Sequence, residues 1–542
     1  MHPGKIRLSF RTMNLKYLAG VSTVVWLLVA SQLPFAQPAR AADDAAAAAT
    51  NASPVSPTDF AAPSVVKVFS TTRYPDIYRP WTKQSPEDET GSGVVIQGQR
   101  ILTCAHVVLY ASQVQIQANQ AGDKISATVE YVAPGIDLAV LKVDDDSFFT
   151  NHPALPFDES LPDTKDAVMV YGYPEGGTSL SITKGIVSRT EFVSYNFPVS
   201  GLRIQIDAAV NPGNSGGPAV VGNKMIGLAF SHLNDSQNIS YIIPCEEISL
   251  FLNDIADGHY DGKPAMYEEL QTLENPALRP FLKIDKSVEG IIVHHPASSE
   301  ESYPLKEWDV ITKIADVPVD DQGMVKVGNN LRVHFTYMIQ KVAKNGELPL
   351  TIVRGGKEMQ IQLPVSARYP TVTPDLGNGY PSYFIYGPMV FSTCTEQFVR
   401  GMTGGERALF RLRLLSARKS PLLTRIGDHP TFDGEELVVV PSPFFPHKLV
   451  EGYEAPFGQV VDSINGIHVR NLAHLVQILR DSHDEFLKIA FAGRDTETMI
   501  FPRAAMSAAT DEILSDNGVR SRGSADMIAI WNADPAGVTP KN

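Results

Sequence analysis

A serine lies within a glycine- and proline-rich run at residues 211–218, which reads NPGNSGGP. Glycine adopts backbone conformations that residues with a Cβ avoid, so the N–H groups around Ser215 can converge on one point. An oxyanion hole needs such converging donors, because they must aim at the oxygen where negative charge develops. The run therefore predicts a nucleophilic Ser215, with Gly213, Asn214 and Ser215 as the oxyanion hole. A surface loop that happens to contain a serine is the alternative.

Two upstream segments offer the partners that a serine nucleophile needs. His106 follows a short apolar strand within ILTCAHVV, and Asp137 opens an otherwise apolar strand within GIDLAVLKV. A serine hydroxyl attacks well only when a neutral imidazole takes its proton, and a carboxylate must fix the tautomer of that imidazole. Taken singly, His106 would be an ordinary core or surface residue and Asp137 a turn residue. The order His106, Asp137, Ser215, with gaps of 31 and 78 residues, is the chymotrypsin-type order and predicts a catalytic triad.

The three blocks resemble those of the HtrA/Deg serine proteases. The motifs TCAHVV, GIDLAVL and NPGNSGGPA carry the resemblance, which continues at VYGYP (170–174), SITKGIVSR (181–189), MIGLAF (225–230) and ISYIIP (239–244). The resemblance to the protease domain runs from about residue 60 to about residue 256. The C-terminal half is more similar to the plant-type Deg branch, with two divergent PDZ-like modules.

The resemblance implies an ATP-independent serine endopeptidase that degrades unfolded or damaged proteins through an acyl-enzyme. A substrate peptide is expected to add as an extended strand along Gly227, Leu228, Ala229, Phe230 and Ser231. No acidic residue stands there, so small or medium apolar P1 residues are expected. Because the family forms trimers through its protease domains, a homotrimer or a larger homo-oligomer is expected. An inactive holdase, or a PDZ scaffold that uses the barrel only for assembly, is the alternative.

The composition agrees with a globular enzyme that acts on polypeptides. The chain has 542 residues, 43% of them hydrophobic and 20% charged, which predicts two to four domains. Its net charge of −14 argues against nucleic acid as a partner. The three cysteines, Cys104, Cys245 and Cys394, lack metal-ligand spacing. No disulfide framework, metal site or cofactor is therefore expected, and Cys104 is expected to fill the core beside the active site.

The N-terminus has the pattern of an export signal over residues 1–41. Basic residues precede an apolar stretch, which is followed by the small-residue sequence ARA at 39–41. The apolar stretch contains glycine, serine, threonine and glutamine, so it would span a membrane poorly. Cleavage after Ala41 is expected to leave no stable membrane span; an uncleaved anchor is the alternative, and Met13 would be a more compact start. Residues 42–57 are expected to be a disordered lead-in. Such a signal fits a periplasm best, with an organellar lumen as the alternative.

The catalytic residues need a rigid scaffold, and short strands supply it. Strands are expected at 64–69, 93–96, 114–118, 127–132, 138–143, 167–170 and 203–207. Their close spacing indicates a β-barrel class, which in this family is a chymotrypsin-like double β-barrel, here over 58–258. One amphipathic helix is expected to end near Gly258. By position, residues 70–90 resemble the family's long regulatory loop, which in some relatives reaches a neighbouring subunit; a loop without regulatory meaning is the alternative.

The C-terminal half is expected to hold two α+β PDZ-like domains, at 259–368 and 384–507, joined by a linker at 369–383. The second contains an Asn-Gly hairpin signal at 465–466, followed by a helical period. Neither module shows a clean GLGF-type loop for a C-terminal carboxylate, so peptide capture and a role in assembly or gating both stay open. Residues 508–542 are expected to be a polar tail, with disorder near its end.

Overall fold

The computed structural model describes residues 59–118, 122–195, 199–232, 240–328, 331–368, 371–405 and 408–533. The expected export signal and lead-in, at 1–41 and 42–57, lie outside the described residues. The predicted mostly-β class is confirmed, because two closed barrels and four further sheets make up most of the regular structure. Within the described residues, no helix is both long and apolar enough to cross a bilayer.

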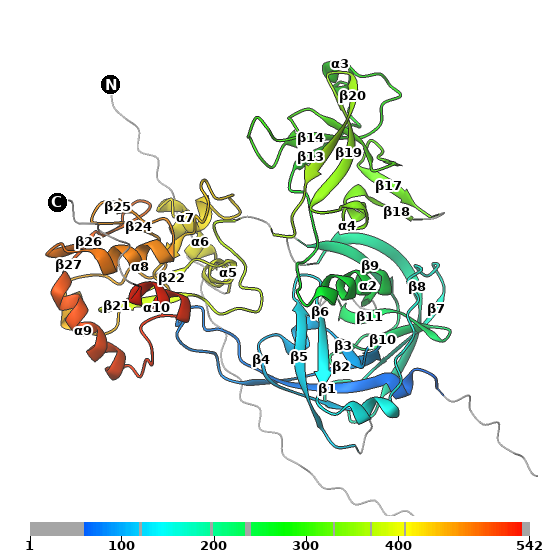
Figure 1. Cartoon of the computed structure of the whole chain (residues 1–542), viewed down its shortest axis with the longest axis horizontal. Helices are drawn as coiled ribbons and strands as arrows, with labels where there is room; N and C mark the ends of the chain where they lie inside the picture. The colour runs from blue at the N-terminus through cyan, green and yellow to red at the C-terminus, as the bar shows by residue number, and fades with distance from the viewer. Residues whose placement is uncertain are drawn as a thin grey trace, which may run out of the picture. The chain divides into compact units, whose positions relative to one another are not determined.

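The first barrel closes in the strand order β1-β2-β3-β6-β5-β4 (Figure 1). Its strands are β1 (Val65–Thr72), β2 (Glu87–Ile96), β3 (Arg100–Thr103), β4 (Ala111–Gln117), β5 (Ile125–Ala133) and β6 (Leu138–Val143). Branched aliphatic residues dominate β1, β3 and β6, and nearly all of them are buried. Such strands are buried on both faces because one face lines the barrel core and the other is covered by neighbouring structure.

The second barrel closes in the order β10-β11-β12-β9-β8-β7. Its strands are β7 (Ala167–Gly172), β8 (Ser181–Ser194), β9 (Ser200–Ile206), β10 (Pro218–Val221), β11 (Lys224–His232) and β12 (Ser240–Pro244). The helix α2 (Cys245–Asp254) follows and packs on β11 and β12. A single 3₁₀ turn continues it to Gly258, which has a φ of 97° and ends the helix in the left-handed conformation. The predicted helix and its end are thus confirmed.

The module that follows the protease domain, hereafter the middle module, contains one principal sheet in the order β13-β14-β15-β19-β20. Its elements are β13 (Glu269–Thr272), α3 (Leu278–Leu282), β14 (Ile291–His295), β15 (Val310–Ile314), β16 (Val317–Pro318), β17 (Met324–Val327), β18 (Leu331–His334), α4 (Ile339–Val342), β19 (Glu347–Arg354) and β20 (Lys357–Pro364). The Gly355-Gly356 turn joins β19 to β20, with φ values of 56° and 79°. Glycine suits this turn because both positions lie in the left-handed region.

The third module, residues 371–533, combines two sheets with several helices. Its elements are β21 (Tyr383–Tyr386), β22 (Met389–Thr393), α5 (Glu396–Thr403), α6 (Ala408–Ala417), α7 (Pro421–Thr424), β23 (Val438–Val439), β24 (Val461–Ile464), β25 (Ile467–His468), α8 (Leu472–Asp481), β26 (Phe486–Phe491), β27 (Met499–Pro502), α9 (Arg503–Asp516) and α10 (Ala525–Asn532). The predicted hairpin turns at Asn465 and Gly466, both with positive φ. The side chain of Asn471 accepts the N–H of His474 and caps α8.

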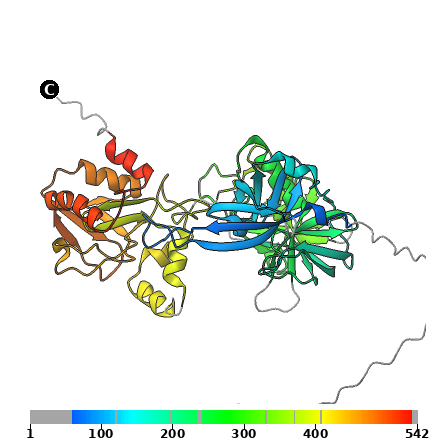
Figure 2. The same ribbon diagram turned by 90° about the horizontal axis from the view of Figure 1, so that it is seen from below.

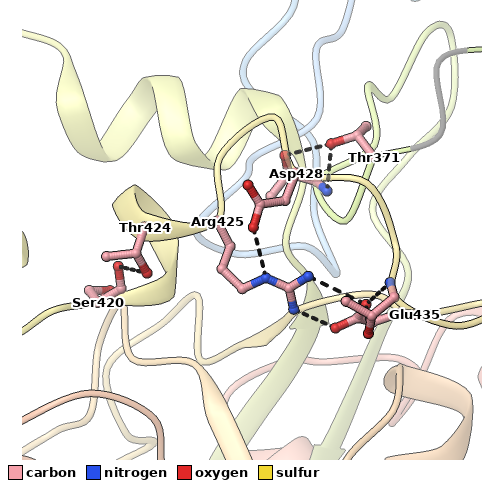
Figure 3. A network of polar contacts seen from close by, with 8 residues as sticks. Thr371, Ser420, Thr424, Arg425, Asp428 and Glu435 are labelled. Carbon is pink, nitrogen blue, oxygen red and sulfur yellow. Dashed lines mark hydrogen bonds and ion pairs between the residues drawn. The ribbon is translucent and has the colours of Figure 1, made fainter. Parts of the chain in front are cut away.

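An ion-pair network fixes the long connection between α7 and β23 in the third module (Figure 3). Arg425 pairs with Asp428 at 3.1 Å and with Glu435, whose carboxylate also accepts the N–H of Thr431 at 2.6 Å. The hydrogen bond from Arg425 is the main reason that the pKa of Glu435 falls to about 2. The connection is therefore held by charge-assisted bonds in place of regular structure.

The expected polar tail is wrong for most of its length. The helix α9 begins before residue 508 and runs through it, and α10 extends to Asn532. Thr510 and Ile513 are buried, and Met527 packs in the same apolar core as β21 and β22. Interspersed glycine, serine and aspartate residues suggested disorder, but the spaced apolar side chains bury against the sheet. Residues beyond 533 lie outside the described part of the chain.

The irregular segment between β1 and β2 is shorter than the predicted loop at 70–90. Strand β1 continues to Thr72 and β2 begins at Glu87, so the irregular part is residues 73–86, hereafter the β1–β2 segment. Asp76 organises its tip by accepting the N–H groups of Tyr78 and Arg79, each at 3.0 Å. This side-chain turn gives the segment a defined shape.

Candidate active site

His106 lies at the start of a single helical turn that follows β3. The turn, α1 (Ala105–Val108), begins after Cys104 in extended conformation and ends at Leu109, also extended. Ala105 and Val107 are buried, whereas the side chain of His106 is 49% exposed. Burial of Ala105 and Val107 thus fixes the backbone of the turn, while the imidazole of His106 stays open to a substrate.

Asp137 holds His106 by two bonds from one carboxylate. Its Oδ2 lies 2.7 Å from Nδ1 of the imidazole, and its Oδ1 accepts the backbone N–H of His106 at 2.9 Å. Asp137 has a φ of 56°, and its own carbonyl accepts the N–H of Ala105. A residue other than glycine costs about 1–2 kcal/mol in this region. Hydrogen bonds to the α1 turn hold Asp137 in this strained conformation. They place its carboxylate beside Nδ1 of the imidazole.

The serine turn, residues 211–217, is clamped between the two barrels. Ser92 of β2 donates its side-chain O–H to the carbonyl of Gly213 at 2.8 Å and its N–H to the carbonyl of Ser215 at 2.8 Å. Gly216 donates its N–H to the carbonyl of Ala229 on β11. A Cβ on Gly216, where φ is 87°, would stand 2.0 Å from the carbonyl oxygen of Ser92. Only glycine permits this approach.

Two backbone donors in the serine turn are available to a ligand. Within the described residues, the N–H groups of Gly213 and Ser215 donate to no protein acceptor. The N–H of Asn214 donates to the carbonyl of Asn211 at 2.9 Å, so it is not available, and this part of the predicted donor set needs correction. The geometry thus leaves two converging donors rather than three.

Ser215 does not contact the imidazole in this structure. Its Oγ lies 3.5 Å from the carbonyl oxygen of Phe230, and no hydrogen bond joins it to His106 in the described part of the chain. A rotation about χ1 moves a serine Oγ between staggered positions at small cost. The serine and the histidine–aspartate pair are thus brought together by the fold, with the final hydrogen bond not formed.

Part of the predicted substrate strand has no free edge. Gly227 and Leu228 pair with β10 on one side and with β12 on the other, so their backbone groups are already engaged. Ala229 exchanges hydrogen bonds with Gly216 and Gly217 of the serine turn. The register of β11 with β12 shifts between Ala229 and Ser231, which leaves Phe230 outside the ladder. The backbone of β11 therefore stays open to an added strand only beyond Ala229, and the sequence of β11 did not reveal this restriction.

An aromatic stack forms the wall beside Phe230. The ring of Tyr195 stacks on Phe230 with centroids 5.4 Å apart, and the guanidinium of Arg203 lies 4.3 Å from the centroid of Tyr195. Burial is the main cause of the raised pKa of Tyr195, so its phenol stays protonated. The wall next to the candidate nucleophile is rigid and largely apolar.

The electrostatics around His106 favour its protonated form. Burial alone lowers the pKa of the imidazole, but the hydrogen bond and the charge of Asp137, with a smaller contribution from Glu89, raise it above its usual 6.5. A raised pKa strengthens the imidazole as a proton acceptor.

Two groups of side chains have the spacing of metal ligands. In the first, Cys104 lies near His106 and Asp137, but burial raises the pKa of its thiol, which donates instead to the carbonyl of Ala229. A protonated thiol is not a metal ligand, so Cys104 acts as the core residue that the sequence predicts. The second group joins Glu269, His294 and His295 on β13 and β14 of the middle module.

Nothing in the sequence pattern singles out Ser92 or Thr103, although both support the serine turn. Thr103 donates its O–H to the carbonyl of Ser92 at 2.7 Å, and Ser92 Oγ accepts the N–H of Tyr173. Both side chains are fully buried. A buried hydroxyl within an apolar strand is a weak signal, because many such residues only bond their own strand.

Two six-stranded barrels, with histidine and aspartate on one and serine on the other, define a trypsin-like serine endopeptidase. Residues 91–228 match the trypsin-like peptidase domain family, and residues 372–526 match the PDZ domain family. The chain belongs to the HtrA/Deg family of serine proteases. It is 35% identical over 481 residues to Protease Do-like 2, chloroplastic, of Arabidopsis thaliana, covering 87% of this chain and 76% of that protein.

Two further similarities extend these findings. The chain is 33% identical over 436 residues to Protease Do-like 4, mitochondrial, of Arabidopsis thaliana, covering 80% of this chain and 79% of that protein. A solved structure of the HtrA-type protease AlgW with a decapeptide is 25% identical with a TM-score of 0.43, covering 57% of this chain and 97% of that one. The two Do-like relatives confirm, at the level of the family, the resemblance stated from the sequence motifs.

Proposed function

We propose that this protein is an ATP-independent serine endopeptidase that degrades unfolded or damaged polypeptides through an acyl-enzyme. One observation carries the proposal: a single carboxylate, that of Asp137, holds both the backbone and the ring of His106 beside the serine turn. That arrangement fixes an imidazole as a base, and the serine turn supplies a nucleophile with two unengaged donors.

In the proposed reaction, Ser215 attacks the scissile carbonyl after its Oγ rotates from the carbonyl of Phe230 toward His106. The imidazole accepts the hydroxyl proton at Nε2 while Nδ1–H stays bonded to Asp137. The C–N bond of the peptide then breaks as His106 gives that proton to the leaving amine. Water repeats the attack on the acyl-enzyme with His106 as base, which returns Ser215 to its starting form.

The oxyanion of each tetrahedral intermediate would be held by the N–H groups of Gly213 and Ser215. Donors that already point at the site need no reorganisation when charge develops, and one such donor is worth about 100–1,000-fold in rate. Hydrolysis of a peptide bond by this route involves only acyl transfer to serine and then to water. No nucleotide enters any step, which is the basis for proposing ATP independence.

The substrate would add as an extended strand along Phe230 and Ser231, where main-chain hydrogen bonds give affinity without sequence preference. This mode suits unfolded chains, because a folded protein seldom offers a free extended segment. The apolar wall formed by Phe230 and Tyr195 supports a small or medium apolar P1 residue.

A fluorophosphonate probe with casein digestion tests the proposal. The probe reacts only with an activated serine, so we expect labelling of the native protein and none of Ser215→Ala. Denatured casein should be cut by the native protein, and the Ser215→Ala variant should leave it intact. A folded, assembled protein that neither takes the label nor cuts casein would point to the holdase or scaffold function instead.

The pH dependence of kcat/KM should respond to Glu89. Removing this negative charge in Glu89→Gln takes away one contribution that raises the pKa of His106. The neutral imidazole is the active form, so activity rises with pH through that pKa and the acidic limb should move to lower pH in the variant. Initial rates on a fluorogenic peptide between about pH 5 and 8 measure the shift. The control is Glu87→Gln, a neighbouring exposed carboxylate; equal profiles for both variants would contradict the prediction.

Assembly and compartment belong to the same proposal. We propose a homotrimer built through the protease domains or a larger homo-oligomer, as the family resemblance implies, and light scattering that gives a monomer would refute it. We also propose that the chain works outside the cytosol. The relatives named chloroplastic and mitochondrial support an organellar lumen over the periplasm. Fractionation of cells carrying a tagged full chain would separate the two compartments.

A further inference from the structure

A cavity of about 490 Å³ lies against the connection that follows His106 and the connection that precedes Asp137. Part of its wall comes from Leu109 and Tyr110, just after His106, and from Gly135, just before Asp137. These are the connections that carry the two candidate catalytic residues. The wall of the cavity is therefore formed in part by residues that lie two to four positions from His106 and Asp137 in the sequence.

The β1–β2 segment and the third module complete the wall. Tyr74 and Ile77 of the segment line the cavity, and Asp375, Gln397 and Arg400 of the third module face it. Figure 2 shows the segment as the blue loop that follows β1. The cavity is thus built from two parts of the chain that are separated by about 300 residues in sequence.

Aromatic side chains anchor the β1–β2 segment on the third module. The ring of Tyr78 meets those of Phe398 and Phe457, with centroids 6.0 and 5.8 Å apart. Trp81 packs on Phe445 with centroids 5.2 Å apart. Such pairs stabilise a contact beyond the burial of their apolar area. The position of the segment therefore depends on the third module.

The segment of the third module that leads into β21 is hydrogen-bonded to the protease domain, at Tyr110 after His106 and at the base of the β1–β2 segment. Tyr110 donates its phenol O–H to the carbonyl of Gly377 at 3.0 Å, and its backbone N–H bonds the side chain of Asn378. Tyr380 donates its O–H to the carbonyl of Arg73 at the base of the β1–β2 segment. Both walls of the cavity are thus bonded to the third module directly.

From this placement we propose that the cavity is a substrate subsite, completed by the third module, that receives an apolar side chain next to the scissile bond. The inference rests on the proposed function, since it needs an extended polypeptide in the active site. It assigns the third module a part in choosing where a chain is cut, in addition to any role in assembly.

The two charged side chains of the cavity, Arg400 and Asp375, already have partners, which favours an apolar occupant. Arg400 pairs with Glu396 of its own helix. Asp375 accepts the N–H of Gly377 and an N–H of Gln397. The walls contributed by Leu109, Pro134, Val199 and Ile77 are apolar. A charged substrate group would lose water here and find no free partner.

Two variants that act from opposite walls test the subsite. Arg400→Trp should fill part of the cavity from the exposed face of α5, and Ile77→Ala should enlarge it from the β1–β2 segment. The readout is the residue preference at each position around the cut bond, obtained by mass spectrometry of a digested peptide mixture. At one position, Arg400→Trp should lower the preference for leucine over alanine by about tenfold. Ile77→Ala should move the preference at that same position toward larger side chains.

The control is Glu454→Trp, which places the same bulky residue at an exposed site of the third module outside the cavity. Its preferences should equal those of the native protein. Fluorophosphonate labelling of every variant confirms that Ser215 is still reactive. Unchanged preferences in both cavity variants, with cleavage retained, would overturn the subsite. Failure of the proposed function has a different signature, namely absence of cleavage by the native protein.

Discussion

Asp137→Asn should lower kcat by about 10⁴-fold while the protein stays folded. The reason lies in the two bonds that Asp137 makes to His106. Its Oδ1 accepts the backbone N–H, so in the variant the amide oxygen keeps this place and the amide NH₂ faces Nδ1 of the ring. The ring nitrogen Nδ1 must then accept a hydrogen bond, which puts the proton on Nε2. An imidazole in that tautomer cannot take the proton of Ser215.

Steady-state rates on a fluorogenic peptide measure this loss, and thermal unfolding followed by circular dichroism checks the fold. The matched control is Asp144→Asn, which makes the same change of charge at an exposed position just beyond β6. Its kcat should stay within about twofold of the native value. If Asp137→Asn kept a tenth or more of the native activity, Asp137 would not orient the base.

Gly213→Ala should lower kcat by about 100–1,000-fold, because it removes one donor of the proposed oxyanion hole. The backbone of Gly213 has a φ of 93°, and a Cβ there would stand 2.4 Å from the backbone nitrogen of Glu175 and 2.5 Å from the carbonyl oxygen of Tyr173. Neither atom belongs to a flexible side chain. The serine turn must therefore move, which takes the N–H of residue 213 away from the developing negative charge.

The effect should appear in kcat more than in KM, since the donor acts in the transition state. Gly222→Ala is the matched control: its φ is 60°, but nothing lies within 4 Å of an added Cβ. This variant carries similar backbone strain in the turn between β10 and β11 without the collision. Equal losses in the two variants would assign the effect to strain alone and would contradict a role of Gly213 as a donor.

The sequence predicts a catalytic triad because its three candidate residues sit in short local motifs. The serine turn needs glycine at positions with positive φ, and such positions leave a visible mark in the sequence. His106 follows one apolar strand and Asp137 precedes another. At both positions the break in the apolar pattern marks the boundary of the strand. The hairpin at Asn465 and Gly466 was predictable for the same reason: its turn geometry allows few residue types.

Long-range features could not be predicted in this way. At Gly227 and Leu228, both edges of β11 are paired, one with β10 and one with β12. Pairing between strands that are distant in the chain has no signature in the sequence of one strand. The role of Ser92 arises only from its contact with the serine turn of the second barrel, and the residues around Ser92 in the sequence do not indicate that contact. The helices α9 and α10 bury spaced apolar residues whose partners lie more than a hundred residues earlier, in β21 and β22.

The amino-acid sequence by itself predicted Ser215, His106 and Asp137 as nucleophile, base and orienting acid, and it determined the β-rich class, since each depends on residue type within a few neighbours. Only the tertiary structure decided which amides of the serine turn remain free, where a peptide can pair, and what surrounds the β1–β2 segment. Those properties depend on which surfaces meet. The same segment looks like a polar loop in the sequence, yet its aromatic side chains pack on the third module and help to close a cavity against the connections that carry His106 and Asp137.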